Sequence, residues 1–454
     1  MLKIIFLLVS IGISFVSYKL FKIAFTDMSL KRYLPHTHLF FFQLLIMCLI
    51  GINTMIFGIK SITLENFGIS ANSIYLATFC IWYTLLTIPI GIIMFHGRHY
   101  KKFTSEFSNF FKCEVQCEDN LFIRIFFSIW VVIGIFVVIY LCKNNAPLYL
   151  QLKGGLSSVL INRVSYSRDF GGSYFIKNVV GQTFIIITSY IIFIYCYITK
   201  KRFWKCLFII SCLCSIFIKG AGMSKSGIAT YIIPFIFILV ILKGDIPLRK
   251  NFKWLLIAIA FLLWAYMQQY NALDVKWYQV LFDFQIGPIG RILNVQIQSF
   301  PAYLQIFPKY FGFTYGAGIA VLKFLNINFI ESARIVAAFL EPIGVQSGTV
   351  GVANTLFLGD AYANFGIIGI LVSPFIVGFW FGYFYKKLVS SSKNPINIAV
   401  YIVILDNLVN SITGGFCSAY LINTKMISCI IYMAIFNLLF NSFKVKEKKR
   451  SIKL

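Results

Sequence analysis

Charged residues are scarce in this sequence. They make up 12% of its 454 residues, and only 15 are acidic, whereas a soluble globular domain carries about 25% charged residues. Hydrophobic residues account for 59% and aromatic residues for 18%, which is more apolar side chain than one water-soluble core can bury. These proportions exclude an ordinary cytosolic enzyme, a disordered chain, a coiled coil and a secreted disulfide scaffold. They predict a polytopic membrane protein.

The sequence also lacks the common motifs of nucleotide and hydrolase chemistry. It contains no P-loop, no GxGxxG after a strand, no GxSxG and no HExxH. The nearest approach to a metal motif is the group of His96, His99, Cys113 and Cys117. Because its spacing departs from the usual zinc patterns and occurs once, we predict no metal and no cofactor. If the chain is an enzyme, its substrate is activated elsewhere and presented in the membrane.

Long apolar runs divide the chain into eleven candidate membrane spans, each near the roughly 20 residues that a crossing needs. The spans are 4–25, 38–59, 72–95, 121–142, 176–199, 203–218, 225–242, 252–270, 357–384, 396–413 and 419–441. Span 357–384 contains Pro374, which favours a kink. The predicted fold is a single all-α integral membrane domain that covers residues 1–454.

Basic residues predict the orientation of these spans. The net charge is 41 − 15 = +26, and every odd-numbered span is followed by a basic cluster, from Lys19 and Lys22 to the tail at 444–453. The positive-inside rule then places the N-terminus outside the cell and the C-terminus in the cytoplasm. The clusters lie between apolar runs and form no continuous patch, so nucleic acid is not an expected partner.

This topology leaves two long outer loops, at about 143–175 and 271–356. Loops of this length are usually functional. The first contains Arg163 and Arg168 beside Asp169. The second contains two further arginines and two acids: Arg291, Arg334, Glu331 and Glu341.

Arginine in an outer loop runs against the topological bias of membrane proteins. Its planar guanidinium binds phosphate or carboxylate through two parallel hydrogen bonds. The four arginines therefore suggest recognition of an anion. The alternative is that they pair with the nearby acids or with lipid head groups.

Two sets of polar residues lie within the predicted spans. Asp360 and Asn364 are one helical turn apart near the start of span 357–384, where they either bind a sugar hydroxyl or serve helix packing with Gly366 and Gly369. Asp406 and Lys425 lie in the last two spans. Because charges at such depth are normally paired or functional, we expect an ion pair, with a proton relay as the alternative.

The chain resembles the O-antigen polymerase family, also called oligosaccharide repeat-unit polymerases. The resemblance covers most of the length and depends on the number of spans, the two arginine-containing outer loops and two short stretches. One stretch is Asp360-Ala-Tyr-Ala-Asn-Phe-Gly366-Ile-Ile-Gly369, and the other is Lys219-Gly-Ala-Gly-Met-Ser-Lys225-Ser-Gly227.

The resemblance implies an enzyme of the bacterial inner (plasma) membrane that makes the O-antigen of lipopolysaccharide or a capsule. Its substrate is an oligosaccharide repeat on undecaprenyl pyrophosphate, and the growing chain is transferred to the incoming repeat. Partners implied are this lipid-linked oligosaccharide and membrane lipids, with a chain-length regulator and a flippase left open.

The same resemblance implies roles for the residues named above. Arginines stabilise the pyrophosphate leaving group (Arg163, Arg168, Arg291 and Arg334), and Asp169, Glu341 or Asp360 is the base. The substrate-binding set is completed by Tyr166, Tyr315, Tyr362 and Asn364. A ligase that moves finished polymer to an acceptor is the alternative within this class, and a flippase or transporter is the alternative outside it.

Overall fold

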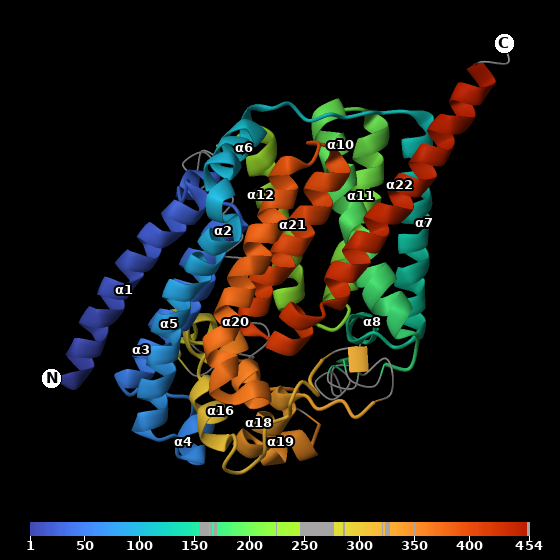
Figure 1. Cartoon of the computed structure of the whole chain (residues 1–454). Helices are drawn as coiled ribbons and strands as arrows, with labels where there is room; N and C mark the ends of the chain where they lie inside the picture. Colours follow the sequence, from blue (N-terminus) through green and yellow to red (C-terminus); the bar gives the residue numbers. More distant parts are fainter. Residues whose placement is uncertain are drawn as a thin grey trace.

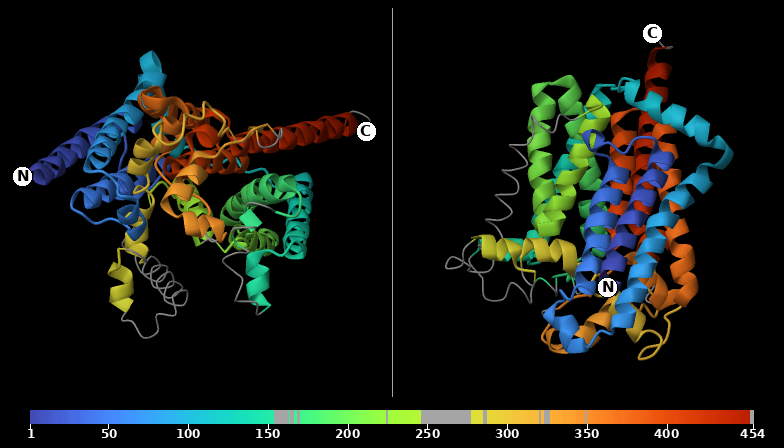
Figure 2. Two further views of the ribbon diagram at one scale, coloured as in Figure 1. Left: turned by 90° about the horizontal axis from the view of Figure 1, so that it is seen from below. Right: turned by 90° about the vertical axis from the view of Figure 1, so that its left-hand side faces the viewer.

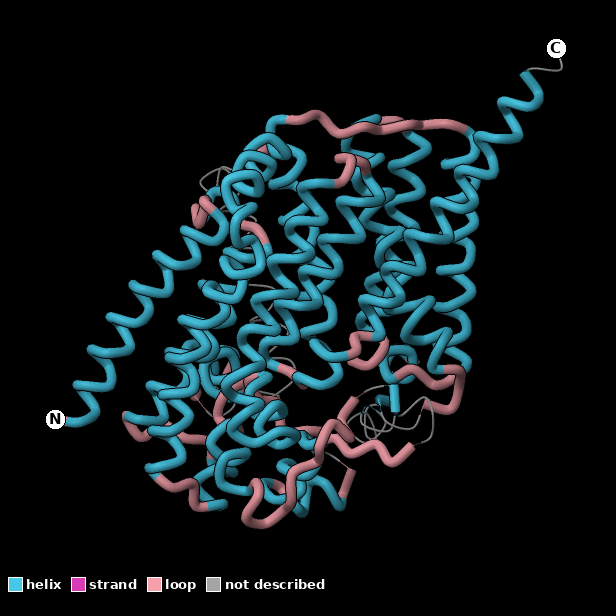
Figure 3. The backbone as a smooth tube through the Cα atoms, in the orientation of Figure 1, coloured by secondary structure: helices cyan, strands magenta, loops and turns pink. Residues whose placement is uncertain are grey.

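The protein is described by a computed structural model. The structure describes residues 1–153, 163, 166–167, 170–223, 225–245, 277–284, 287–319, 321–322, 327–348 and 350–451. Within these ranges the chain forms helices joined by loops and turns, with no strand (Figure 3). The all-α class that the composition predicts is therefore confirmed.

Ten helical segments in the described ranges are long and apolar enough to cross a membrane. They coincide with ten of the eleven predicted spans, and the remaining prediction, 252–270, lies outside the described residues. The segments are α1 (Leu2–Phe25), α2 with η2 and α3 (Pro35–Ile56), α5 (Ala71–His96) with α6 (Tyr100–Lys112), α7 (Leu121–Lys143), η5 with α10 (Phe175–Thr199), α11 (Arg202–Gly220), α12 (Lys225–Lys243), α20 (Phe357–Ser390), α21 (Pro395–Asn410), and η9 (Cys417–Leu421) with α22 (Thr424–Ser451).

The long helices form one bundle with two different ends. In Figure 1, short helices cover the lower end, while α22 projects beyond the upper end. Figure 2 shows that α1 lies at one edge of the bundle and α22 at the opposite edge. We call the lower layer the cap. It consists of α16 (Phe300–Ile306), α18 (Ser332–Leu340), α19 (Pro342–Gln346) and the described loop residues 307–319.

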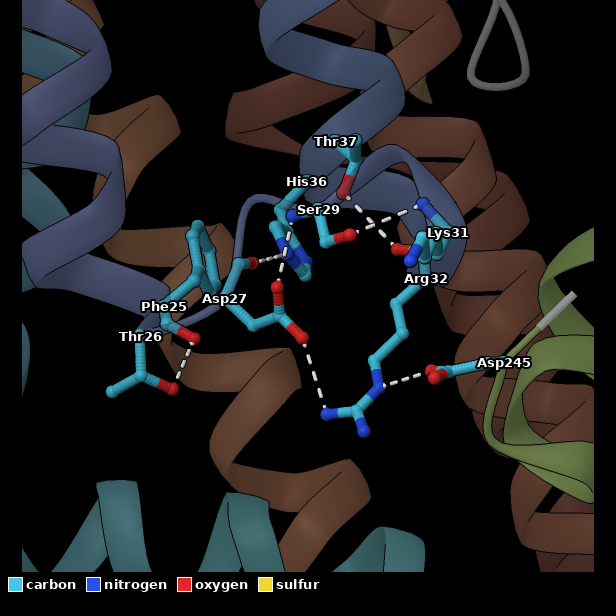
Figure 4. Close-up of polar contacts among 9 residues, drawn as sticks. All are labelled: Phe25, Thr26, Asp27, Ser29, Lys31, Arg32, His36, Thr37 and Asp245. Atoms are coloured by element: carbon cyan, nitrogen blue, oxygen red, sulfur yellow. Dashed lines mark hydrogen bonds and ion pairs between the residues drawn. The ribbon is translucent and has the colours of Figure 1, made fainter. Parts of the chain in front are cut away.

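Ion pairs connect the loops at the end opposite the cap. Arg32 donates from Nε to Asp245 over 2.6 Å and from Nη1 to Asp27 over 3.2 Å, which joins the α1–α2 connection to the end of α12 (Figure 4). Asp119 accepts from Arg124 over 2.8 Å and from Lys201 over 2.6 Å. The loops after α1, α6, α10 and α12 therefore lie at one end, as the alternation of basic clusters predicts. The side of the membrane they face stays a prediction.

Glycines allow α5 and α20 to cross closely in the middle of the bundle. A Cβ atom on Gly378 would overlap the backbone carbonyl of Ile88, and a Cβ atom on Gly91 would lie 3.0 Å from the carbonyl of Phe375. Small residues at such crossings let two helix backbones approach and pack. The pair α5–α20 thus forms the rigid centre to which the cap is attached.

Helix α20 is broken near the cap, at Gly366. Gly366 has φ 61° and ψ −145°, a conformation that glycine adopts with little strain. The ring of Phe313 lies 3.1 Å from the position that a Cβ atom on Gly366 would occupy. The break at Gly366 was not expected from the sequence, and the kink expected at Pro374, which lies within α20, stays a prediction.

Candidate active site at the capped end

Asn364 attaches the cap loop to α20. Its Oδ1 accepts hydrogen bonds from Thr314 Oγ1 at 2.8 Å and from the backbone N–H of Gly316 at 2.9 Å. Its Nδ2 donates to the backbone carbonyl of Asp360 at 2.8 Å and to Asp360 Oδ1 at 3.0 Å. The side chain is fully buried, and it uses both donors and both acceptor positions of its amide.

The backbone at the break in α20 is satisfied by the same loop. The carbonyl of Ala363 accepts from the N–H of Thr314 at 2.9 Å, and the carbonyl of Asn364 accepts from the N–H of Tyr315 at 3.1 Å. A broken helix leaves carbonyls without intrahelical partners, and a membrane-embedded break is tolerated where protein groups replace them. The described residues 311–319 form this loop from turns and irregular backbone. The loop donates hydrogen bonds to α20 and also forms turns along its own chain, where the N–H of Ala317 donates to the carbonyl of Thr314 at 2.9 Å and the N–H of Ile319 donates to the carbonyl of Gly316 at 3.1 Å.

Asp360 joins three segments that are distant in sequence. Its Oδ1 accepts from Ser332 Oγ at 2.6 Å, on α18, and from Asn364 Nδ2. Its Oδ2 accepts from the backbone N–H of Cys417 at 2.9 Å, on η9. The side chain is 7% exposed. The predicted position of Asp360 and Asn364 on one helix face is confirmed. For Asp360 to remove a substrate proton, one of the hydrogen bonds that its carboxylate accepts would have to be displaced.

Two further predicted residues belong to the cap. Arg334 on α18 donates from Nε to Glu331 Oε2 at 2.8 Å, and both side chains are partly exposed. This is the acid pairing that the sequence left as the alternative to anion recognition. Glu341 follows the last residue of α18 and is half-buried.

The cap also places two of the predicted tyrosines differently. Tyr315 is 79% exposed on the loop that contacts Asn364. Tyr362 on α20 donates its hydroxyl to the carbonyl of Phe307 at 3.3 Å, and its ring lies edge-on to Phe313. Tyr315 is thus available to a ligand, whereas Tyr362 holds the cap to the bundle.

The remaining predicted residues lie on other elements. Arg163 is half-buried, and the residues on both sides of it are outside those that the structure describes. Arg291 is exposed at the start of η7 (Arg291–Val295), which packs against α3. The predictions for Arg168 and Asp169 lie outside the described residues. Arg163, Arg291 and Arg334 therefore occupy three separate elements of the described chain.

Lys177 forms a site that the sequence reasoning missed. Its Nζ donates to the carbonyl of Tyr166 at 2.5 Å and lies 4.0 Å from the ring centroid of Tyr166 and 4.4 Å from that of Phe170. Tyr166, Phe170 and Tyr174 recur every four residues ahead of Lys177, so helical spacing of aromatics before a lysine was the available signal. Tyr166 is buried, and this burial raises the pKa of its hydroxyl, which therefore stays protonated. Tyr166 thus binds a lysine of its own chain through its ring and its carbonyl.

The buried carboxylate of Asp406 has a different environment from that of Asp360. Asp406 is 4% exposed, and its Oδ1 has no hydrogen-bond partner among the described residues. The charges of Lys425 and Lys219 act on it electrostatically, but no ion pair joins them in the described chain. The predicted Asp406–Lys425 ion pair is therefore not formed among the described residues: Lys425 acts on the carboxylate only as a nearby charge.

Histidine, cysteine and acidic residues form no group of three that could hold a metal ion within the described residues. For the grouped His96, His99, Cys113 and Cys117, the structure shows His96 stacked on Phe103 with ring centroids 3.8 Å apart. His96 is thus packed as an aromatic side chain.

Comparisons with known proteins give no relative. No family model matches the sequence, no curated protein matches it, and no solved structure matches its fold.

Proposed function

We propose that this chain is a glycosyltransferase of the bacterial inner (plasma) membrane that polymerises oligosaccharide repeats carried on undecaprenyl pyrophosphate. The product is an O-antigen or a capsular polysaccharide, made at the outer face. The proposal takes its substrate class from the sequence resemblance to O-antigen polymerases. With the basic loops on the cytoplasmic side, the cap faces the outside, where lipid-linked repeats are displayed.

The observation that carries the proposal is the attachment of the cap. Asp360 and Asn364 together accept hydrogen bonds from α18, from loop residues 314–316 and from η9. Such a fully bonded buried network fixes a surface layer in one geometry. A fixed layer that presents Arg334 and the exposed Tyr315 suits an enzyme that orients two large lipid-linked substrates.

In the proposed reaction, a hydroxyl oxygen of the incoming repeat attacks the anomeric carbon of the growing chain. The bond from that carbon to the pyrophosphate oxygen breaks, and the hydroxyl proton passes to a carboxylate. Negative charge grows on the leaving pyrophosphate, which arginines are suited to stabilise. We assign Arg163, Arg168, Arg291 and Arg334 to this task and Asp169, Glu341 or Asp360 to the proton. Glu341 is favoured over Asp360, whose two oxygens are already bonded.

A ligase that transfers finished polymer shares this donor and these residues. A transporter is the second candidate, and the break of α20 at Gly366 favours it, since transporters use discontinuous helices at their substrate sites. In this chain, however, the carbonyls freed by the break are bound by residues 314 and 315.

The test is deletion of the gene followed by gel analysis of surface polysaccharide. Complementation would use the natural protein and the variants Arg291→Ala, Arg334→Ala and Glu331→Gln. If Arg334 acts on the substrate, Arg334→Ala loses the ladder and Glu331→Gln keeps it, because only the first removes the guanidinium. Lys309→Ala, an exposed cap lysine, is the matched control, and immunoblots confirm equal amounts of each variant.

Each mechanism predicts a different result in the deletion strain. A polymerase leaves single-repeat products, a ligase leaves long polymer on the lipid carrier, and a transporter leaves lipid-linked repeats on the inner leaflet. An unchanged ladder would refute polymerisation. Arginine variants that leave polymer length and yield normal would refute the role given to arginine.

A further inference from the structure

Three charged residues lie at the capped ends of three helices of the bundle. Lys219 is next to the last residue of α11, Asp406 is one turn before the end of α21, and Lys425 is the second residue of α22. Helix α21 packs against α22 and α10, and α10 packs against α11 (Figure 1). The charges of Lys219 and Lys425 act on each other and on Asp406. We call these three residues the charge cluster.

Counted by formal charges, the charge cluster is positive by one. It contains two ammonium groups and one carboxylate, and no ion pair within it neutralises any of them in the described chain. Charges inside a membrane protein are costly unless they are paired. Both lysines are half-buried while Asp406 is buried. A bound anion beside the two lysines would balance the cluster.

The orphaned oxygen of Asp406 adds a second requirement. Its Oδ1 is buried and accepts no hydrogen bond from any described residue. A buried acceptor without a donor costs free energy, and almost all such groups in proteins are satisfied by protein, water or ligand. A ligand for the cluster therefore needs a hydroxyl donor close to its anionic group.

We infer that Lys219, Lys425 and Asp406 form a binding site for a phosphate ester that carries a neighbouring hydroxyl group. The two ammonium groups bind the phosphate oxygens, and Asp406 Oδ1 accepts a hydrogen bond from the hydroxyl. Two ligands have this chemistry: a lipid-linked glycosyl diphosphate and the glycerol phosphate headgroup of phosphatidylglycerol. If the ligand is the lipid-linked glycosyl diphosphate, the inference rests on the proposed function. The sugar–phosphate junction of the substrate would then bind at these helix ends and not at the loop arginines.

The test is binding to the purified full-length protein in phosphatidylcholine nanodiscs. Two soluble probes are compared: farnesyl diphosphate, and farnesyl diphosphate linked to glucose, which has a C2 hydroxyl next to the phosphate and one negative charge fewer. Lys219→Met and Lys425→Met are each expected to weaken both probes about tenfold or more, because each removes a charged hydrogen-bond donor. Lys243→Met, at the opposite end of α12, is the matched control and leaves both affinities unchanged.

Asp406→Asn gives the sharper result, since it changes the affinities of the two probes to different extents. It removes a negative charge near the phosphate, so farnesyl diphosphate binds more tightly. It also replaces the acceptor for the hydroxyl by a weaker one, so the preference for the sugar probe is lost. A competition experiment distinguishes the two candidate ligands. If phosphatidylglycerol displaces the sugar probe, the lipid headgroup is identified as the ligand.

Three outcomes would overturn the inference. The first is that neither probe binds saturably to the natural protein. The second is that the affinities of the lysine variants lie within about twofold of the affinity of the natural protein. The third is that Asp406→Asn changes the affinities of both probes equally. If a methionine variant does not fold, the matching glutamine variant is used in its place. A deletion strain with an intact ladder refutes polymerisation but leaves this binding result standing. If the deletion strain loses the ladder but the variants of the charge cluster bind both probes like the natural protein, only the proposed binding site is refuted.

Discussion

Replacing Asn364 by leucine tests whether one buried amide holds the cap on the bundle. Leucine has nearly the same shape, so the packing of α20 is retained while the hydrogen bonds of the amide are lost. The donors that Asn364 Oδ1 accepts are Thr314 Oγ1 and the Gly316 N–H. In the variant, Thr314 keeps a second acceptor, the carbonyl of Ala363 at 3.3 Å, but the Gly316 N–H keeps none in the described chain.

The expected cost follows from these partners. One stranded buried N–H costs about 1–3 kcal/mol, and each of the other lost hydrogen bonds costs about 1 kcal/mol. Asp360 Oδ1 keeps the hydrogen bond from Ser332, so its share is small. We expect a local loss of about 3–4 kcal/mol, confined to the contact between the loop and α20.

Hydrogen exchange measured by mass spectrometry in detergent micelles reports this local loss. Amides in 312–319 are expected to exchange roughly 100- to 1,000-fold faster in Asn364→Leu, which corresponds to about 3–4 kcal/mol, while amides of α10 and α21 are unchanged. Tyr315→Ala, which alters an exposed side chain on the same loop, serves as the control. Unchanged exchange at 312–319 in Asn364→Leu would refute the anchoring role.

Two further predictions concern the opposite end and the centre of the bundle. Arg124 and Lys201 hold the pKa of Asp119 well below its usual range, so these pairs stabilise the fold above about pH 4 and the gain is lost as the pH falls through the lowered pKa. Asp119→Asn is therefore expected to lower the free energy of unfolding by about 2 kcal/mol at pH 7. In denaturant unfolding, the difference in this free energy between the variant and the natural protein should become smaller in acid. A difference that does not change with pH would contradict this. Gly378→Leu places side-chain atoms on a carbonyl of α5 and should abolish the monodisperse peak in size-exclusion chromatography, whereas Gly12→Leu, with open space around it, should not.

The helical bundle was predictable because its signal is local. An apolar run of sufficient length forms a membrane helix whatever its neighbours are, and ten predicted spans match described helices. The break in α20 was not predictable in the same way. The sequence draws attention to Pro374, but the break lies at Gly366, where residues 313–316 supply a packing ring and new hydrogen-bond partners.

The two buried carboxylates show where sequence reasoning about the site stops. The contact between Asp360 and Asn364 follows from helical spacing, but the other donors to Asp360 come from Ser332 and Cys417, which lie 28 and 57 residues away. Asp406 has a comparable apolar context in the sequence, yet its Oδ1 receives no donor from the described chain. Whether a buried carboxylate is saturated or left with an open acceptor thus depends on distant segments. An oxygen with all its bonds made fixes structure, whereas one with a position open has free energy to gain from a ligand. The charge cluster, more than the cap network, is therefore where a bound hydroxyl would alter the molecule.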